Sequence, residues 1–196
     1  EATEDFHKTG AVTPLKASYQ ESSIKDLVSK RITWLIALVL ISLFSAGIIA
    51  IYEETLQTVI VLAIFIPLLL GSGGNAGAQA STLMVRAIAT SDVHIDEWLE
   101  VFLKELIVGL LLGLLMGIIG LIFGSLRGGY EIGLIVGLTM LTVVLAANLI
   151  GVMLPFLLTK MGLDPAVASN PLITSITDVL GLLIYFAIAT MVLGGL

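Results

Sequence analysis

The chain alternates between long uncharged stretches and short segments that carry its charged residues. Five stretches are apolar and long enough to cross a bilayer core of about 30 Å as helices that rise about 1.5 Å per residue. They are residues 32–51, 56–86, 98–126, 132–159 and 164–193. An amphipathic segment over residues 22–32 leads directly into the first of them. The pattern therefore predicts an all-α polytopic membrane protein with five transmembrane helices.

Local signals refine these predicted helices. Asp96 is placed to cap the third helix, and Asp164 followed by Pro165 is placed to open the fifth. Pro67 and the glycine-rich run after it predict a bent or loosened backbone in the second. In the third helix glycine recurs at every fourth residue, at positions 109, 113 and 117. Such a repeat lets membrane helices approach closely, so we expect these glycines to serve packing.

Composition agrees with a membrane location. Hydrophobic residues make up 58% of the chain and charged residues 12%, whereas a soluble domain has about 25% charged residues. The net charge of −6 lies in the loops and the N-terminal segment, and there is no basic cluster, so a nucleic-acid partner is not expected. The first residue is Glu1 rather than methionine, and we expect the chain to be a fragment of a longer protein.

The distribution of lysine and arginine predicts the orientation in the membrane. These residues are concentrated in the N-terminal segment, in the link over residues 86–104 and at Lys160, whereas the two opposite links contain only Arg127. Positive residues favour the cytoplasmic side. We therefore expect a cytoplasmic N-terminus and an external C-terminus, in the plasma (inner) membrane of a bacterium or archaeon.

Polar residues form a stripe inside the second predicted helix. They recur at steps of three and four residues, which places them on one helical face. They are Ser72, Asn75, Gln79, Thr82 and Arg86. Within a bilayer, polar groups are tolerated where they are buried in protein or line a water-filled path.

Asp178 is the most informative residue of the fifth predicted helix. It shares a helical face with Asn170 and Thr174. An ionisable group this deep costs at least about 2.5 kcal/mol, so it marks a functional site by default. The alternative is a structural role, in which Asp178 is hydrogen-bonded to Asn148 or to the amides of the second helix, although amide partners alone do not neutralise a buried charge.

The chemistry of this predicted site favours a hard divalent cation. One carboxylate and several neutral oxygens lie at similar depth, with no intramembrane base, and oxygen ligands suit Mg²⁺. Two Asp178 side chains facing the axis of a symmetric dimer would match the charge of one Mg²⁺. Because Mg²⁺ sheds water reluctantly, we expect contact through its hydration shell, and Co²⁺, Mn²⁺ or Ni²⁺ could then also pass.

Several segments, in chain order, resemble the membrane domain of the MgtE family of magnesium channels and transporters. They include GSGGNAGAQASTLMVRAIAT, ANLIGVMLPFLL and SNPLITSITDVLGLLIY, and the resemblance covers essentially the whole chain. It implies a homodimer with five spans per subunit and a central ion path. It also implies that residues 1–31 are a cytoplasmic connecting, or plug, helix region that follows absent soluble N and CBS domains, and that residues 32–196 conduct the ion.

The resemblance also implies roles for individual residues. Asp178 matches the aspartate that holds hydrated Mg²⁺ in the pore, and Asn170, Thr174, Gly71 and Gly74 fall where oxygens line that site. Asn75 and Gln79 of the polar stripe complete the candidate metal set. Glu1, Glu4 and Asp5 match acids that bind regulatory Mg²⁺, and their alternative interpretation is a solvated acidic face. Ala78 departs from the family pattern, since some members have an asparagine there.

Two other classes of function compete with ion transport. An intramembrane hydrolase needs two acids, or a serine with a base, but the deep acid stands alone and His7 and His94 lie outside the predicted spans. We therefore do not expect an enzyme. A non-conducting membrane scaffold would use the small-residue faces equally well. Ion flux into liposomes separates transport from both, while channel and coupled carrier stay open.

Overall fold

The computed structural model describes residues 7–14 and 18–194. Within this part of the chain all regular elements are helical, which confirms the all-α class. The elements are α2 (Ile24–Ile51), α3 (Glu53–Thr58), α4 (Val61–Ala89), η1 (Ile95–Glu97), α5 (Trp98–Lys160), η2 (Pro165–Val167) and α6 (Asn170–Val192). Four of these helices are long and apolar enough to cross a membrane. The predicted helix before the first span is confirmed from Ile24 on, because α2 runs without a break into that span.

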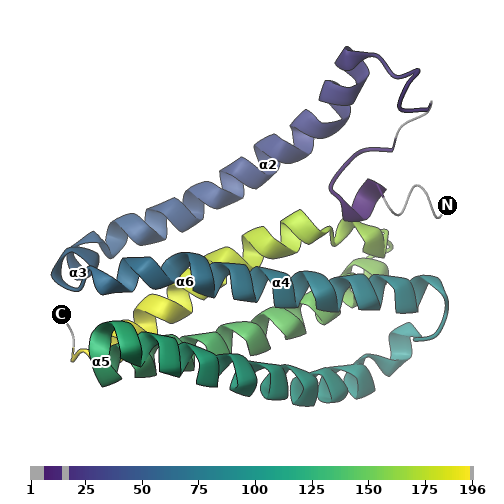
Figure 1. Cartoon of the computed structure of the whole chain (residues 1–196). Helices are drawn as coiled ribbons and strands as arrows, with labels where there is room; N and C mark the ends of the chain where they lie inside the picture. Colours follow the sequence, from purple (N-terminus) through teal and green to yellow (C-terminus); the bar gives the residue numbers. More distant parts are fainter. Residues whose placement is uncertain (1–6, 15–17, 195–196) are drawn as a thin grey trace.

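The 63-residue helix α5 folds back on itself at Gly129, where φ is 83° and ψ is −179°. Glycine tolerates this positive φ because it has no Cβ. A Cβ at Gly113 would lie 2.6 Å from the carbonyl oxygen of Leu141, and one at Gly117 would lie 3.0 Å from that of Gly137. The two arms of α5 are therefore antiparallel and in direct contact (Figure 1). This confirms the packing role of the glycines, and the two arms correspond to the third and fourth predicted spans. Five membrane crossings stay a prediction.

Helices α4, α5 and α6 bury a common apolar core. Its fully or nearly buried side chains include Leu62, Phe65, Ile135, Leu182 and Phe186. Tyr185 is also buried, and its hydroxyl donates a hydrogen bond of 2.9 Å to the carbonyl oxygen of Leu62. The hydrogen bond of Tyr185 satisfies a hydroxyl that would otherwise be costly to bury. Tyr52 stacks on Phe186 with the ring centroids 4.4 Å apart.

Helix α2 contributes no buried side chain to this bundle. Only its C-terminal end, at Ile48 and Ile49, packs against the core. Figure 1 shows α2 leaving the other helices towards its N-terminal end. Most of the remaining side chains of this apolar helix are exposed within the single chain, with Leu43 60% and Phe44 69% exposed. Such a surface requires lipid or another protein surface around it.

The expected loosening of the backbone at Pro67 is wrong. α4 is helical from Val61 to Ala89 and includes Pro67 and the whole glycine-rich run. The interruption lies earlier, between α3 and α4, where Val59 has φ −125° and ψ 71°. A proline removes one backbone hydrogen bond of a helix. Near the start of α4 that loss is tolerated without a break.

Two predicted helix caps also differ from the structure. Asp96 lies inside η1 and caps no helix; there the backbone N–H of His94 donates to Glu97 Oε2 at 2.8 Å. Asp164 does cap a helix, because its Oδ1 accepts the backbone N–H of Ala166 at 2.9 Å. That helix is the short η2, however, and α6 begins only at Asn170.

Candidate cation site

The seam between α4 and α6 positions Asp178. A Cβ at Gly74 would lie 2.9 Å from Thr174 Cγ2, and a Cβ at Gly181 would lie 3.3 Å from Leu70 Cδ2. These two contacts show that α4 and α6 run antiparallel. Asp178 lies between Thr174 and Gly181 along α6, so its level on α4 is between Gly74 and Leu70. The absence of a side chain at Gly74 thus allows α6 to lie against the glycine-rich part of α4.

Hydrogen bonds fix the start of α6 on α4. The fully buried Ser81 donates through Oγ to the carbonyl oxygen of Ala168 at 3.0 Å. At the next residue of α4, the exposed Thr82 Oγ1 lies 3.2 Å from Asn170 Oδ1 and 2.8 Å from the carbonyl oxygen of Ala78. A buried polar group that is satisfied as Ser81 is specifies one arrangement of the helices. The seam therefore holds the polar face of α6 in register with that of α4.

The predicted polar stripe of α4 lies on the face that the rest of the chain leaves uncovered. Asn75, Gln79, Thr82 and Arg86 are exposed, and Ser72 is partly exposed. The opposite face is buried and consists of apolar and small residues such as Leu69, Gly73, Gly77, Ala80 and Met84. Gly71 also lies on the open side, since a Cβ there would meet no atom within 4 Å. The prediction of a one-sided stripe is confirmed.

Asp178 is partly buried, and among the residues that the structure describes it has no hydrogen bond or ion pair. The structural alternative gave Asp178 a hydrogen bond to Asn148 or to the amides of the second helix. Asn148 is 4% exposed and instead donates to Glu105, at 2.9 Å to Oε2 and 3.1 Å to the backbone oxygen. That alternative is therefore wrong for Asn148, whose amide joins the two arms of α5.

The predicted site residues lie on two neighbouring helices. Gly71, Gly74, Asn75 and Gln79 come from α4, and Asn170, Thr174 and Asp178 come from α6. Gly74 and Thr174 meet at the seam, whereas Gly71, Asn75 and Gln79 lie on the open face of α4 beside it. No group of three or more His, Cys, Asp or Glu side chains able to hold a metal occurs within residues 7–14 and 18–194. Glu1, Glu4 and Asp5, the predicted regulatory ligands, lie outside the described residues.

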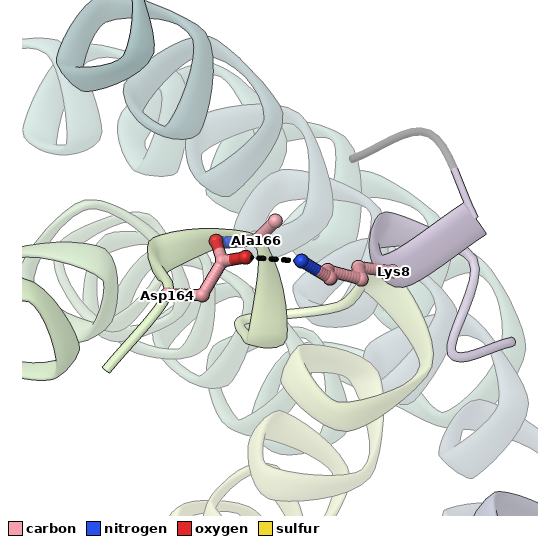
Figure 2. A network of polar contacts seen from close by, with 3 residues as sticks. All are labelled: Lys8, Asp164 and Ala166. Carbon is pink, nitrogen blue, oxygen red and sulfur yellow. Dashed lines mark hydrogen bonds and ion pairs between the residues drawn. The ribbon is translucent and has the colours of Figure 1, made fainter. Parts of the chain in front are cut away.

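Sequence reasoning missed an ion pair between the N-terminal segment and the turn before α6. Lys8 Nζ lies 2.6 Å from Asp164 Oδ2, and the side chains are 26% and 37% exposed (Figure 2). Burial acts to raise the pKa of Asp164, but the hydrogen bonds from Lys8 and from the backbone of Ala166, together with the charge of Lys8, lower it below its ordinary value. No local pattern could have revealed this pair, because its members are 156 positions apart.

The fold and the seam define a membrane protein built of apolar helices that carries a carboxylate on a partly polar helix–helix contact. Comparison with known families agrees, because the family described as a divalent cation transporter, MgtE, matches residues 66–188. This match covers more than half of the chain and includes Asp178. The chain belongs to the MgtE family.

Curated relatives support this assignment along nearly the whole chain. The magnesium transporter MgtE of Thermus thermophilus is 44% identical over 193 residues, which are 98% of this chain and 43% of that protein. The proteins of the same name from Enterococcus faecalis and Bacillus subtilis are 36% and 31% identical, each over 97% of this chain and 42% of their own length. The chain thus spans less than half the length of these relatives. These relatives are transporters and not enzymes, in agreement with the prediction from the sequence.

Proposed function

We propose that this chain forms the ion path of a transporter that carries Mg²⁺ across the bacterial plasma membrane, and that Asp178 holds the ion. The observation that carries the proposal is the position of Asp178 on the polar seam, partly buried and without a partner among the described residues. An intramembrane carboxylate is expensive unless something compensates its charge. A passing cation supplies that compensation, and the names of the relatives support magnesium as the cargo.

The charge of the ion favours a homodimer. One chain offers one deep carboxylate at the seam, whereas two chains related by a two-fold axis offer two, which balance one Mg²⁺. We propose that the open faces of α4 and α6 point towards this axis. The residues that line the path are then Gly71, Gly74, Asn75 and Gln79 of α4 with Asn170, Thr174 and Asp178 of α6.

The neutral side chains suit an ion that keeps its water. Amide and hydroxyl groups exchange hydrogen bonds with a hydration shell, and Mg²⁺ loses that shell reluctantly. We therefore propose that Asp178 holds Mg²⁺ mainly through bound water. Co²⁺ has the same charge and a similar octahedral shell, and it passes by the same route.

The N-terminal segment is proposed to regulate the path. Residues 1–31 would form the cytoplasmic connecting (plug) region of a longer chain, and Glu1, Glu4 and Asp5 would bind regulatory Mg²⁺ against its soluble N and CBS domains. Residues 32–196 would form the conducting domain. The contact of Lys8 with Asp164 supports this proposal, because it places the segment beside the turn that leads into α6.

The experiment is Mg²⁺ flux into liposomes that contain a magnesium-sensitive dye, with wild type and Asp178→Asn compared. The substitution keeps the volume of the side chain and removes two charges per dimer from a path of low dielectric constant. We expect normal expression and dimerisation with flux near background. Near-normal flux in the variant would overturn the role of Asp178, and absence of flux in the wild type would favour a non-conducting scaffold.

The matched control is Glu105→Gln. Glu105 is another carboxylate within a predicted span, but it accepts a hydrogen bond from Asn148 on α5 and does not belong to the seam. The glutamine carbonyl preserves that acceptor. Flux should therefore be retained in this variant. Equal loss in both variants would show that any change of intramembrane charge stops flux, which contradicts a specific site at Asp178.

A further inference from the structure

A groove of about 620 Å³ lies at one end of α5, away from the seam that carries Asp178. Its walls are apolar except for two charged side chains. The lining residues are Ile95, Asp96, Trp98, Ile150, Met153, Leu154, Phe156, Leu157 and Lys160. The volume is in the range of about 300–1,000 Å³ that is typical of ligand sites.

The fold of α5 explains why both charges are at the same end of the groove. Asp96 precedes the first residue of α5 and Lys160 is its last residue. Because α5 folds back at Gly129, its two ends lie on the same side of the bundle, opposite the fold-back (Figure 1). From Lys160 back to Ile150 the second arm rises about 15 Å, which is the thickness of about half the hydrocarbon core.

We propose that this groove binds one phospholipid with a primary amine headgroup, of the phosphatidylethanolamine class. An acyl chain lies along the apolar wall from Leu157 to Ile150. The phosphate lies at Lys160 and the ammonium group at Asp96. Trp98, which is 50% exposed, lines the groove at the level where tryptophan meets the headgroup region of a bilayer.

The pair of opposite charges selects this headgroup over others. Phosphatidylglycerol carries a phosphate but no cation for Asp96, and phosphatidylcholine carries a quaternary ammonium that cannot donate a hydrogen bond to a carboxylate. A primary ammonium donates up to three. The apolar wall is about 15 Å long, which is the length of one acyl chain in one leaflet. A bound protein segment would have no reason to match this length. The inference is independent of which ion the seam carries.

The test uses the fluorescence of Trp98. The chain has two tryptophans, so Trp34→Phe leaves Trp98 as the only one. This full 196-residue variant is reconstituted in phosphatidylcholine vesicles that contain a small fraction of a lipid brominated along its acyl chain, with an ethanolamine, glycerol or choline headgroup. We expect Trp98 to be quenched at up to about fivefold lower mole fraction of the ethanolamine lipid than of the other two, because all three lipids offer a phosphate to Lys160 and only the single ion pair with Asp96 distinguishes them.

Two variants in this background separate the two charges. Asp96→Asn should abolish the preference for ethanolamine over glycerol, and Lys160→Gln should raise the mole fraction needed for all three lipids. Glu100→Gln is the matched control, since Glu100 is an exposed acid of the first turn of α5 that does not line the groove, and it should change nothing. Equal quenching by the three lipids in the Trp34→Phe protein would overturn the proposal. So would an absence of quenching, which would show that protein covers the groove.

Discussion

Lys8 and Asp164 form an ion pair of 2.6 Å across 156 positions of the chain. The same carboxylate accepts the backbone N–H of Ala166, so it both caps η2 and holds the N-terminal segment. η2 leads directly into α6, which carries Asp178. The pair is therefore a direct physical connection between the predicted cytoplasmic segment and the helix of the candidate ion site.

The first prediction concerns the strength of this pair and its dependence on pH. The pKa of Asp164 is lowered in the folded state, so its contribution to stability is complete above the ordinary pKa of 3.8 and is lost as pH falls through the lowered value. A double-mutant cycle of Lys8→Ala and Asp164→Ala should give a coupling free energy of about 0.2–1 kcal/mol at neutral pH, because the pair is partly exposed. Unfolding in mixed micelles measures it.

The control cycle combines Lys30→Ala with Asp164→Ala, since Lys30 is another lysine of the N-terminal part whose side chain has no hydrogen bond or ion pair among the described residues. Its coupling should be close to zero at every pH. A Lys8–Asp164 coupling that persisted unchanged at about pH 2 would contradict the assignment to charge.

The second prediction separates the lining of the ion path from packing. Gly71 and Gly47 both have open space where a Cβ would lie. Within a helix, alanine is favoured over glycine by up to about 1 kcal/mol, so both substitutions to alanine should leave folding intact or improve it. Only Gly71→Ala should reduce Mg²⁺ flux in liposomes, because only Gly71 lies on the open face of α4 that is proposed to line the ion path. If the two variants conduct equally, Gly71 does not line the path.

The third prediction concerns the contact between the arms of α5. A Cβ at Gly113 would lie 2.6 Å from the carbonyl oxygen of Leu141, and a backbone atom cannot move aside as a side chain can. Gly113→Ala should therefore lower the free energy of unfolding by about 1–3 kcal/mol, as overpacking usually does. Thermal unfolding in detergent measures this, with Gly47→Ala as the variant that should not be destabilised. Unchanged stability of Gly113→Ala would mean that the arms are farther apart.

The fourth prediction concerns the dimer. The chain has no cysteine, so Thr174→Cys and Leu183→Cys each introduce a single thiol on α6. At 100° per residue these positions lie on opposite sides of the helix, and Leu183 is 47% exposed. Oxidation should crosslink subunits through residue 174 only, because the Thr174 side faces the proposed two-fold axis. A crosslink at residue 183 instead would place the other face of α6 at the interface.

The sequence predicted the features that depend on spacing along one helix. The stripe from Ser72 to Arg86 and the glycine repeat from Gly109 to Gly117 are each set by the period of 3.6 residues, and both lie in the structure as expected. Apolar length likewise predicted the long helices. These patterns need no knowledge of which helix packs against which.

Features that depend on the choice of partner were not predictable in this way. Asn148 is bonded to Glu105, 43 positions away, and this choice follows from the direction in which α5 folds back. The presence of Glu105 inside an apolar segment was the signal that a polar partner was required. The cap predicted at Asp96 was wrong for a different reason. The short helix η1 precedes α5 there, and Glu97 rather than Asp96 accepts a backbone N–H at its start, that of His94.

The isolation of α2 gives the surrounding bilayer a mechanical role. The apolar part of the helix, residues 32–51, is about 30 Å long, which equals the thickness of the hydrocarbon core. In a bilayer thinner than this length the helix tilts, and α2 has no buried side chains to resist this. Its tilt should therefore follow membrane thickness, which polarised infrared spectroscopy in thin and thick bilayers would measure, and a constant angle would contradict it. The N-terminal segment is bonded to α2 through Thr13 and Lys30, and it is paired with Asp164 through Lys8. A change in the tilt of α2 should therefore pull on the turn that leads into α6.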